Sequence, residues 1–444
     1  MQIGAVIVPI NQRLLAEEIS SIVDEAGARL LFTTPYLDHA NIPEQYATTQ
    51  TITLSPRYTA DGKALLHTIA AGVDLWAEIE KSPPYTSRSF DTIKDDDALA
   101  LIYTSGTTSR SKGVVRTFGQ IVQNAKTFSR LFHMPRGVRF LGTFSQGYLG
   151  GLYNTLLFQF VAEGSVALDA GFDASVALRF WETVKKYQVT ALWPVPSMLS
   201  IILAVDRDTV GEEYAPEHLK YVFTGTAPLT SSLKRSFEER YGVTLYEDYA
   251  LSETFFIATD TPNLPQHKGV GRVIPGCAVS IVDDQDEECP PGVSGEIVVT
   301  SAYMANEYFK NSSETAERFR NGKFYTGDVG YLDADQYLFV TDRKKDIIIR
   351  GGINISPKEI EEVVASVSGV REVAVVGLPH PVTGEEIVVV AVGEGVSDAQ
   401  IQSTCEQHLA PFKVPSRVVW VPSLPKSATG KIQKHKVKQL VPSL

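Results

Sequence analysis

The chain has 444 residues, of which 43% are hydrophobic and 21% charged, and its formal net charge is −11. This composition is ordinary for a globular protein and excludes bulk disorder. The negative charge argues against nucleic acid as the main partner, because a phosphate backbone binds to basic surfaces. The length predicts two or three folding units and so allows a cleft between domains.

The sequence carries no sign of export or membrane insertion. The first ten residues are apolar but lack a basic flank and a small-residue cleavage site, so we expect no secretory signal. No apolar run reaches the ~18 residues that span a bilayer, so we expect a soluble protein without an integral membrane segment. Cys277, Cys289 and Cys405 have no metal-ligand spacing, which fits a reducing cytoplasm.

Strand-like and helix-like segments alternate through the first 250 residues, which predicts an α/β sheet with helices packed on it. A polar, proline-containing connection is expected at 81–97. The expected strands are 5–10, 28–32, 98–103, 189–193, 219–224 and 243–246. The expected helices lie near 14–25, 174–187, 196–205 and 230–241.

After about residue 270 the pattern changes to short strands with turns, such as 277–282 and 295–300, which predicts a β-rich subdomain. The charged stretch 342–346 precedes a final α+β segment. Its expected strands are 373–376, 387–392 and 418–421, and its expected helices lie near 357–367 and 398–409. We therefore predict a large N-terminal α/β domain with a β-rich subdomain, residues 1–342, and a small C-terminal α+β domain, residues 343–444.

A loop of small polar residues follows the predicted strand 98–103. It contains Thr104, Ser105, Gly106, Thr107 and Thr108, with Lys112 close behind. Backbone N–H groups and hydroxyls in such a loop can surround phosphate oxygens, and a lysine adds charge. The loop is not a P-loop, because Gly113 rather than Ser or Thr follows the lysine, and this argues against a Walker-type ATPase. Taken alone, a flexible turn is an equally good interpretation.

Four later segments also carry polar groups in suggestive places. They are Tyr249-Ala-Leu-Ser-Glu-Thr254, Tyr325-Thr-Gly-Asp328, Asp342-Arg-Lys-Lys-Asp346 and Leu424-Pro-Lys-Ser-Ala-Thr-Gly-Lys431. In isolation the first indicates a strand-to-helix turn capped by Ser252, and the second a β-turn. The third is typical of a solvated linker and the fourth of a surface loop.

Together with the loop at 103–114, and in this order, the segments resemble the motifs of the adenylate-forming superfamily. This superfamily contains acyl-CoA synthetases, adenylation domains of peptide synthetases and luciferases. The resemblance covers nearly the whole chain and implies an acyl-CoA synthetase-like fold. This chain starts some tens of residues later than its members, so we expect an N-terminally short form. Members usually have glycine and proline where this chain has Ser109 and Ser111, which implies a less mobile or less efficient loop.

The resemblance implies roles for individual residues. Lys431, Glu253 and Thr104 would be catalytic, with Glu253 holding magnesium on the ATP phosphates. The ATP- or AMP-binding residues would be Thr104, Ser105, Gly106, Thr107, Thr108, Lys112, Gly225, Thr226, Ala227, Tyr249, Ser252, Asp328 and Arg343. The ring of Tyr249 would stack on adenine, and the Asp328 carboxylate would accept hydrogen bonds from the ribose hydroxyls. Lys345 would be the hinge of the small domain.

The resemblance also implies which kind of acid the chain would bind. Tyr148, Gly225 and Ala250 would line the acyl pocket, and Thr226 and Ala250 are bulkier than the glycines usual at their positions. Added bulk shortens a cavity, so we expect a short, branched or aromatic acid. No aspartate lies between Leu141 and Leu152, where amino-acid-activating relatives have one, and this favours an acid without an α-amino group.

The predicted reaction activates the acid with ATP as acyl-AMP and then forms a thioester with coenzyme A, whose pantetheine arm would pass Gly351 and Gly352. One alternative is a stand-alone enzyme that loads the acid onto an acyl carrier protein. Another is a nucleotide-binding protein with impaired catalysis.

Overall fold

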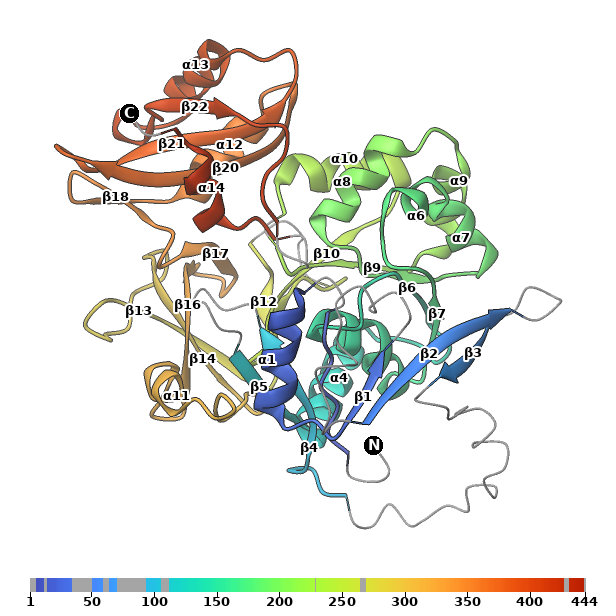
Figure 1. The fold of residues 1–444 in the computed structure, drawn as a ribbon. Helices are drawn as coiled ribbons and strands as arrows, with labels where there is room; N and C mark the ends of the chain where they lie inside the picture. Colours follow the sequence, from blue (N-terminus) through green and yellow to red (C-terminus); the bar gives the residue numbers. More distant parts are fainter. Residues whose placement is uncertain are drawn as a thin grey trace, which may run out of the picture. The chain divides into compact units, whose positions relative to one another are not determined.

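The computed structural model describes residues 5–11, 14–33, 50–58, 64–69, 93–104, 112–227, 229–263, 269–426 and 431–442. They form two compact units. The first comprises Met1–Gly119, Ser145–Leu152 and Tyr308–Lys310, and the second comprises Gln120–Phe144, Tyr153–Glu307 and Asn311–Leu444. Figure 1 labels the helices and strands of both units. In the described part of the chain, no helix is both long and apolar enough to cross a membrane.

The described part of the first unit contains helix α1 (Ala16–Ala26), two small groups of strands, the first residues of α4 (Phe118–Leu131) and part of a π-helix, η3 (Gly150–Leu157). Helix α1 ends at Gly27, whose φ of 63° is the left-handed conformation that a helix C-cap requires. Strand β1 (Leu30–Thr33) pairs in parallel with β2 (Gln50–Tyr58), which pairs antiparallel with β3 (Ala64–Ile69). The strands β4 (Ala98–Thr104) and β5 (Lys112–Thr117) form an antiparallel pair.

Two predictions for the N-terminal half need correction. Residues 5–10 do not form a full strand, because only Ile7 makes an isolated bridge, to Ala100 of β4. The helix expected at 174–187 is interrupted at Arg179, whose guanidinium lies 2.6 Å from the Asp169 carboxylate. Most of the connection expected at 81–97 lies outside the described residues.

The centre of the second unit is a seven-stranded sheet in the order β12-β11-β10-β9-β8-β6-β7. Its first five strands in the chain are parallel, and their order, second-first-third-fourth-fifth, is that of a doubly wound fold. The strands are β6 (Arg139–Gly142), β7 (Ser165–Leu168), β8 (Ala191–Leu192), β9 (Tyr221–Thr224), β10 (Leu245–Leu251), β11 (Phe255–Thr259) and β12 (Arg272–Val273). Ligands bind at the carboxyl ends of the strands in such sheets.

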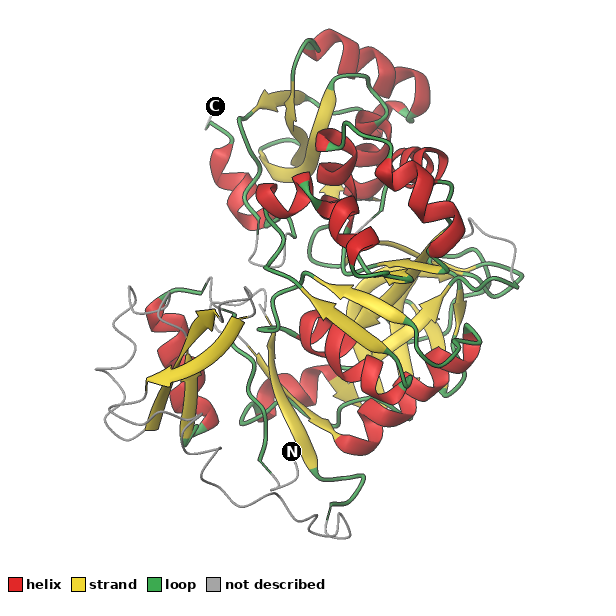
Figure 2. Cartoon of the chain, turned by 90° about the vertical axis from the view of Figure 1, so that its right-hand side faces the viewer, coloured by secondary structure: helices red, strands yellow, loops and turns green. Residues whose placement is uncertain are grey.

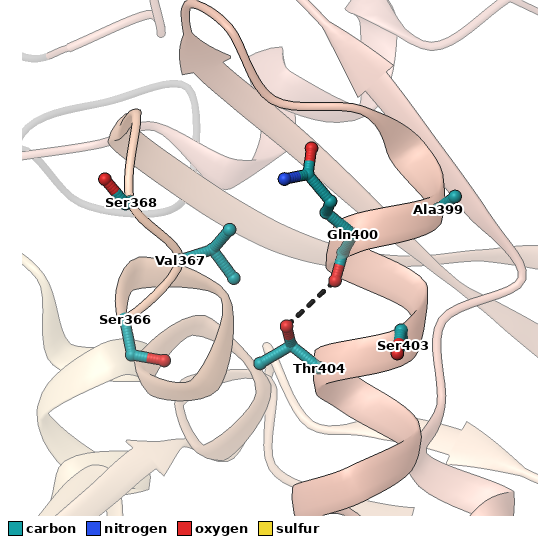
Figure 3. A pocket seen from close by; sticks show the side chains of 7 residues that line it. All are labelled: Ser366, Val367, Ser368, Ala399, Gln400, Ser403 and Thr404. Atoms are coloured by element: carbon teal, nitrogen blue, oxygen red, sulfur yellow. Dashed lines mark hydrogen bonds between the residues drawn. The ribbon is translucent and has the colours of Figure 1, made fainter.

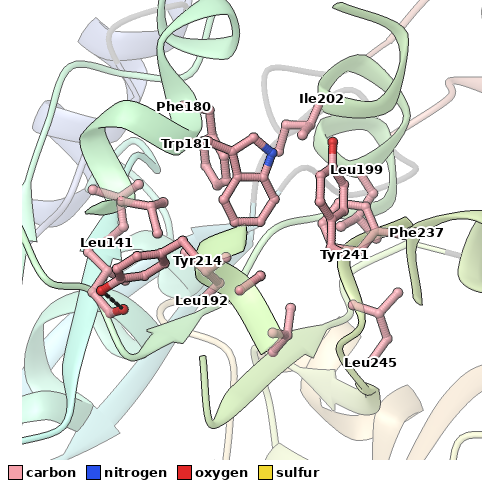
Figure 4. Close-up of a cluster of buried hydrophobic side chains, with 14 of the residues drawn as sticks. Leu141, Phe180, Trp181, Leu192, Leu199, Ile202, Tyr214, Phe237, Tyr241 and Leu245 are labelled. Atoms are coloured by element: carbon pink, nitrogen blue, oxygen red, sulfur yellow. Dashed lines mark hydrogen bonds between the residues drawn. The ribbon is translucent and has the colours of Figure 1, made fainter. Parts of the chain in front are cut away.

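Helices cover both faces of this sheet (Figure 1). Successive side chains of a strand point to opposite faces, so apolar side chains lie on both faces and pack against helices. On one face, Leu192, Val222 and Leu245 belong to a buried cluster with residues of four helices (Figure 4). Those helices are α7 (Phe180–Lys186), α8 (Pro196–Val205), α9 (Val210–His218) and α10 (Ser231–Tyr241). On the other face, Trp193 and Phe223 contact rings of α4 (Phe118–Leu131) and α5 (Phe158–Val161). The remaining helix, α6 (Ala174–Leu178), precedes α7.

The β-rich subdomain follows, as expected, and its sheet has the order β13-β14-β16-β15 with β17 paired to β16. These strands are β13 (Cys277–Val282), β14 (Gly295–Ser301), β15 (Phe319–Arg320), β16 (Lys323–Leu332) and β17 (Leu338–Arg343), and helix α11 (Ser312–Arg318) precedes β15. Ile281, Ile297 and Leu338 pack with Ile257 of β11, which joins this sheet to the central one.

The C-terminal segment builds a third sheet, in the order β19-β18-β21-β20 with β22 beside β21. Its elements are β18 (Ile348–Arg350), β19 (Ile353–Ile355), α12 (Pro357–Ala365), β20 (Val370–His380), β21 (Gly384–Gly393), α13 (Asp398–His408), the short η4 (Pro411–Lys413), β22 (Arg417–Trp420) and α14 (Lys434–Leu440). Val375 and Val389 pack under α12 and α13, whereas Val376 and Val388 pack with Val437 of α14. Helices therefore cover both faces of this sheet (Figure 2).

The core cluster of Figure 4 yields a stability test with a matched control. Leu199 of α8 is fully buried, whereas Leu178 of α6 is 70% exposed. We expect Leu199→Ala to destabilise the fold by about 2–5 kcal/mol, because the cavity left behind adds to the lost transfer free energy. Leu178→Ala should change stability little. Thermal unfolding of both variants measures the difference, and equal losses would contradict this assignment of the core.

Candidate functional site

Strand β10 ends at the second of the five motifs. The turn Ser252–Thr254 leads into β11, which runs back antiparallel. The strand-to-helix turn that Ser252 indicates in isolation is therefore wrong, because the chain continues as a hairpin. The pairing shifts register between Tyr249 and Ala250. Such irregularities bend a strand and re-aim its side chains, and they are common beside active sites.

Asp328 is held in place by its own strand, β16. Its N–H donates to the Thr326 hydroxyl at 3.0 Å, and that hydroxyl donates to the Ile297 carbonyl at 2.7 Å. Gly327 has a φ of 72°, which glycine adopts without strain, and its N–H donates to Glu296 at 3.0 Å. The isolated β-turn that the sequence suggests at 325–328 is thus a distorted part of a long strand. It fixes a carboxylate that is only 4% exposed.

Two neighbours bind that carboxylate, one at each oxygen. The Tyr249 hydroxyl donates to Oδ2 of Asp328 at 2.6 Å, and Nε of Arg343 lies 2.6 Å from Oδ1. Arg343 is the register partner of Asp328 on β17. Burial raises the pKa of Tyr249, and the charge of Asp328 raises it further. Desolvation works to lower the pKa of Arg343, but Asp328 and the other acidic groups around it raise it on balance. The guanidinium and the carboxylate therefore stabilise each other's charges.

Lys431 joins this group from the C-terminal segment. Desolvation lowers the pKa of its ammonium, and the positive charge of Arg343 lowers it further. Asp328 and Glu253 act in the opposite direction, so all three groups are within electrostatic range of Lys431. Five of the residues that the sequence predicts for the site, including Tyr249, are therefore close together in the second unit.

Gly225, Thr226 and Ala227 follow the carboxyl end of β9. A Cβ on Gly225 would lie 2.6 Å from Oδ1 of Asp248, so the glycine allows a close approach to β10. Thr226 has a φ of 68°, which is strained for a β-branched residue. Its hydroxyl is buried and has no hydrogen-bond partner in the described part of the chain.

The phosphate loop is described only at its two ends. Thr104 closes β4 and is the register partner of Lys112, which opens β5. The Thr104 hydroxyl donates to the Lys112 carbonyl at 3.4 Å. The four predicted residues between them, Ser105, Gly106, Thr107 and Thr108, lie outside the described residues. Tyr148 belongs to the same unit as Thr104 and Lys112, and burial raises its pKa.

The segment that joins β17 to the C-terminal sheet contains the remaining candidates. Lys345 lies in a turn after β17, and desolvation lowers the pKa of its ammonium. Gly351 and Gly352, in the turn between β18 and β19, have φ values of 60° and 81°. A Cβ on either would meet nothing within 4 Å, so these glycines serve the turn geometry and leave open space beside the backbone.

Two cavities lie elsewhere in the second unit. One of about 450 Å³ is lined by Ser366, Gln400 and Thr404, among others, in the C-terminal segment (Figure 3). A larger one of about 1260 Å³ is rich in charged residues, including Lys234, Glu247 and Lys358. Neither includes a predicted site residue. In the described chain no three His, Cys, Asp or Glu side chains are grouped to hold a metal ion.

The comparisons with known proteins identify the family of the chain. The family model for the AMP-binding enzyme matches residues 1–309, and the model for the AMP-binding enzyme C-terminal domain matches residues 359–431. The chain belongs to the AMP-binding enzyme family. This confirms the resemblance to adenylate-forming enzymes that the five motifs indicate.

Individual relatives cover almost all of the chain. A sulfoacetate–CoA ligase of Cupriavidus necator is 30% identical over 98% of this chain and 83% of its own length. The long-chain-fatty-acid–CoA ligase FadD13 of Mycobacterium tuberculosis is 31% identical over 99% of this chain and 84% of its own. The ATP-bound crystal structure of MatB from Rhodopseudomonas palustris has a TM-score of 0.85 at 26% identity, over 99% of this chain and 84% of that one. The predicted fold class is confirmed.

Sequence reasoning missed the neighbours of the site residues. Asp248, directly before Tyr249, is buried and accepts a hydrogen bond from Nε1 of Trp193 at 2.9 Å. Glu296 holds both the Gly327 N–H and, at 3.3 Å, the Lys344 ammonium. The sequence gives no local signal for Asp248, because it follows Glu247 in a strand of mixed polarity.

The hydrogen bond between Tyr249 and Asp328 gives a direct test of this geometry. We expect Tyr249→Phe to destabilise the fold by about 1.5–3 kcal/mol, because it removes a short, buried hydrogen bond to a charged acceptor. Tyr187→Phe is the control, because Tyr187 is 41% exposed. Thermal unfolding measures both, and a neutral Tyr249→Phe variant would contradict the hydrogen bond.

Proposed function

We propose that this chain is an AMP-forming acid–CoA ligase. It uses ATP to convert a carboxylic acid to acyl-AMP and pyrophosphate, and then transfers the acyl group to the thiol of coenzyme A. The observation that carries the proposal is the grouping of Lys431 with Glu253, Arg343 and Asp328 in a chain of this family. The two relatives described above are CoA ligases.

In the first half-reaction the substrate carboxylate attacks the α-phosphate. Lys431 stabilises the negative charge that develops on the phosphate oxygens, because a cation placed where charge develops stabilises the transition state. Asp328 accepts the ribose hydroxyls, Arg343 lies beside it to contact ribose or phosphate, and Tyr249 stacks on the adenine. Thr104 takes part in catalysis and binds phosphate together with Lys112 and the four residues Ser105, Gly106, Thr107 and Thr108. Gly225, Thr226, Ala227 and Ser252 complete the nucleotide site.

Magnesium fits this scheme through Glu253. Magnesium commonly binds to one or two carboxylates plus the phosphates of its nucleotide, so a cluster of protein ligands is not required. Glu253 is one of the acidic groups whose charge reaches Lys431 and Arg343. The ion would neutralise phosphate charge and help to orient the triphosphate.

In the second half-reaction the residues 343–444 act as a mobile domain that turns about Lys345, withdrawing Lys431 from the site of 1–342. The open backbone at Gly351 and Gly352 supports a passage for the pantetheine arm of coenzyme A. A carrier-protein thiol is the alternative acceptor.

The acid is short, branched or aromatic. Support comes from Gly225, whose missing Cβ would meet Asp248, and from Thr226 and Ala250, which add bulk at the same ends of β9 and β10. Tyr148, which is half-buried, is the remaining residue of the proposed acyl pocket. The names of the two relatives span sulfoacetate and long-chain fatty acids, so the acid has to be read from the pocket itself.

The catalytic lysine is tested by pyrophosphate exchange that depends on the acid. We expect Lys431→Ala to lower the exchange rate on the order of 10²–10³-fold, because it removes the cation at the transition state. Lys436→Ala is the matched control, an exposed lysine at the start of α14. Full exchange activity of Lys431→Ala would refute the assigned role.

The acceptor and the acid are tested with the unmodified protein. With ATP and a turned-over acid, we expect free coenzyme A to be converted to a thioester and a phosphopantetheinylated carrier protein to remain unloaded. The reverse result would favour the carrier-loading alternative.

The length of the acid is tested with a series of straight-chain acids. Across this series, kcat/KM should fall before dodecanoate because of the short pocket. A maximum at dodecanoate to hexadecanoate would refute the short-acid assignment.

A further inference from the structure

Asp248 is a buried carboxyl group that the proposed reaction leaves without a role. It is 5% exposed and lies in the middle of β10, directly after Glu247, which pairs with Thr224 at the carboxyl end of β9. Ligands of doubly wound sheets bind at such strand ends. Its surroundings are aromatic, since its partner Trp193 packs against Phe223 and Phe256 at ring-centre distances of 4.5 and 5.2 Å. A carboxyl group in such a place is unfavourable unless its oxygens are hydrogen-bonded.

Only one of its two oxygens is satisfied. Oδ2 accepts the Trp193 N–H at 2.9 Å, whereas no hydrogen bond reaches Oδ1 from the described residues. Oδ1 is the atom next to Gly225, only 2.6 Å from where a Cβ would be. Any larger residue at 225 would clash with it. The free oxygen of Asp248 therefore adjoins the glycine that we propose for the acyl pocket.

The protonation state decides what this oxygen can bind. Burial raises the pKa of Asp248 to about 8, Glu247 adds to the shift, and the hydrogen bond from Trp193 opposes it. At neutral pH the group is therefore mainly a carboxylic acid. Because Oδ2 accepts from Trp193, the proton belongs on Oδ1, which then donates towards Gly225.

We propose that Asp248 is a specificity-determining residue that donates a hydrogen bond to an uncharged oxygen on the acyl part of the substrate. This inference rests on the proposed function. The preferred substrate is then an acid that carries a hydroxyl or keto oxygen, such as a hydroxy-substituted aromatic acid or a short hydroxy or keto acid. An alkyl or plain aryl acid leaves Oδ1 without a hydrogen-bond partner, and a site built for a hydrogen bond rejects such a substrate.

An ammonium-bearing acid is the competing possibility. It would need the ionised form of Asp248, which its burial disfavours. A second carboxylate on the acid would also be disfavoured, because no cation among the described residues contributes to the electrostatics of Asp248. The neutral oxygen remains the best match to a neutral donor in an aromatic pocket.

The test compares acids in matched pairs, by the kcat/KM of pyrophosphate exchange with the full-length protein. The pairs are benzoate against each hydroxybenzoate, butyrate against each hydroxybutyrate and each ketobutyrate, and butyrate against aminobutyrates. We expect the unmodified protein to prefer an oxygenated acid in at least one pair by about 10- to 100-fold, the size of effect expected for one buried hydrogen bond.

Three variants assign that preference to Asp248. Asp248→Leu should abolish it, whereas Asp248→Asn should retain part of it, because the amide still accepts from Trp193 and donates from its nitrogen. Asp96→Leu makes the same chemical change at an exposed turn and should leave the preference unchanged. Thermal unfolding checks that each variant is folded, and the Asn variant keeps the test informative if Asp248→Leu does not fold.

The outcomes separate this inference from the function on which it rests. Exchange without a preference for oxygenated acids, a preference for aminobutyrates, or a preference unchanged in Asp248→Leu or lost in Asp248→Asn would overturn the role of Asp248 alone. Absence of exchange with every acid would overturn the proposed function, and the role of Asp248 with it.

Discussion

The Asp328 carboxylate connects the parts of the candidate site. One oxygen binds the Tyr249 phenol at the end of β10, and the other binds Arg343 at the end of β17. A buried carboxylate with so little exposure must be paired, so it fixes both partners as much as they fix it. Strand β10 is therefore connected at one point to the β16–β17 pair, which lies more than 70 residues later in the sequence. The position of the phenol and of the guanidinium follows from this single buried charge.

The charge of Asp328 also affects the pKa of Lys431. Desolvation and the positive charge of Arg343 lower the pKa of Lys431, whereas the charges of Asp328 and Glu253 act in the opposite direction. With two cations and two carboxylates the formal charges of these four side chains cancel. A triphosphate would add negative charge that Lys431 and Arg343 can attract, whereas Glu253 would be left to a metal ion. Each oxygen of Asp328 keeps a further lone pair beside its present partner, so the carboxylate can also accept from the ribose hydroxyls.

The sequence predicts the regular parts of the fold well and the long-range contacts poorly. Helices α8 and α10 and strands β13 and β14 lie almost where the hydrophobic periodicity indicates, because each buries one face against a single layer. Helix α9 is not predicted, since Pro216 lies inside it and masks its pattern. The hydrogen bond between Tyr249 and Asp328 joins residues 79 positions apart. No local pattern encodes such a pair, and only the family motifs indicate that both belong to one site.

Asp248 shows the limit of that motif reasoning. Its neighbour Tyr249 carries the resemblance, and in a strand the next side chain points to the opposite face. The motif therefore says nothing about what Asp248 contacts, and only the structure brings it to Trp193 and Gly225. Thr226 adds a second unsatisfied group at the ends of β9 and β10, with a buried hydroxyl and a left-handed backbone that glycine would adopt without strain. Two polar groups left without partners are unfavourable for an apolar acyl chain. They are compatible with a substrate that brings oxygen atoms of its own, so the chemistry of this end of the sheet favours an oxygenated acid over a longer hydrocarbon.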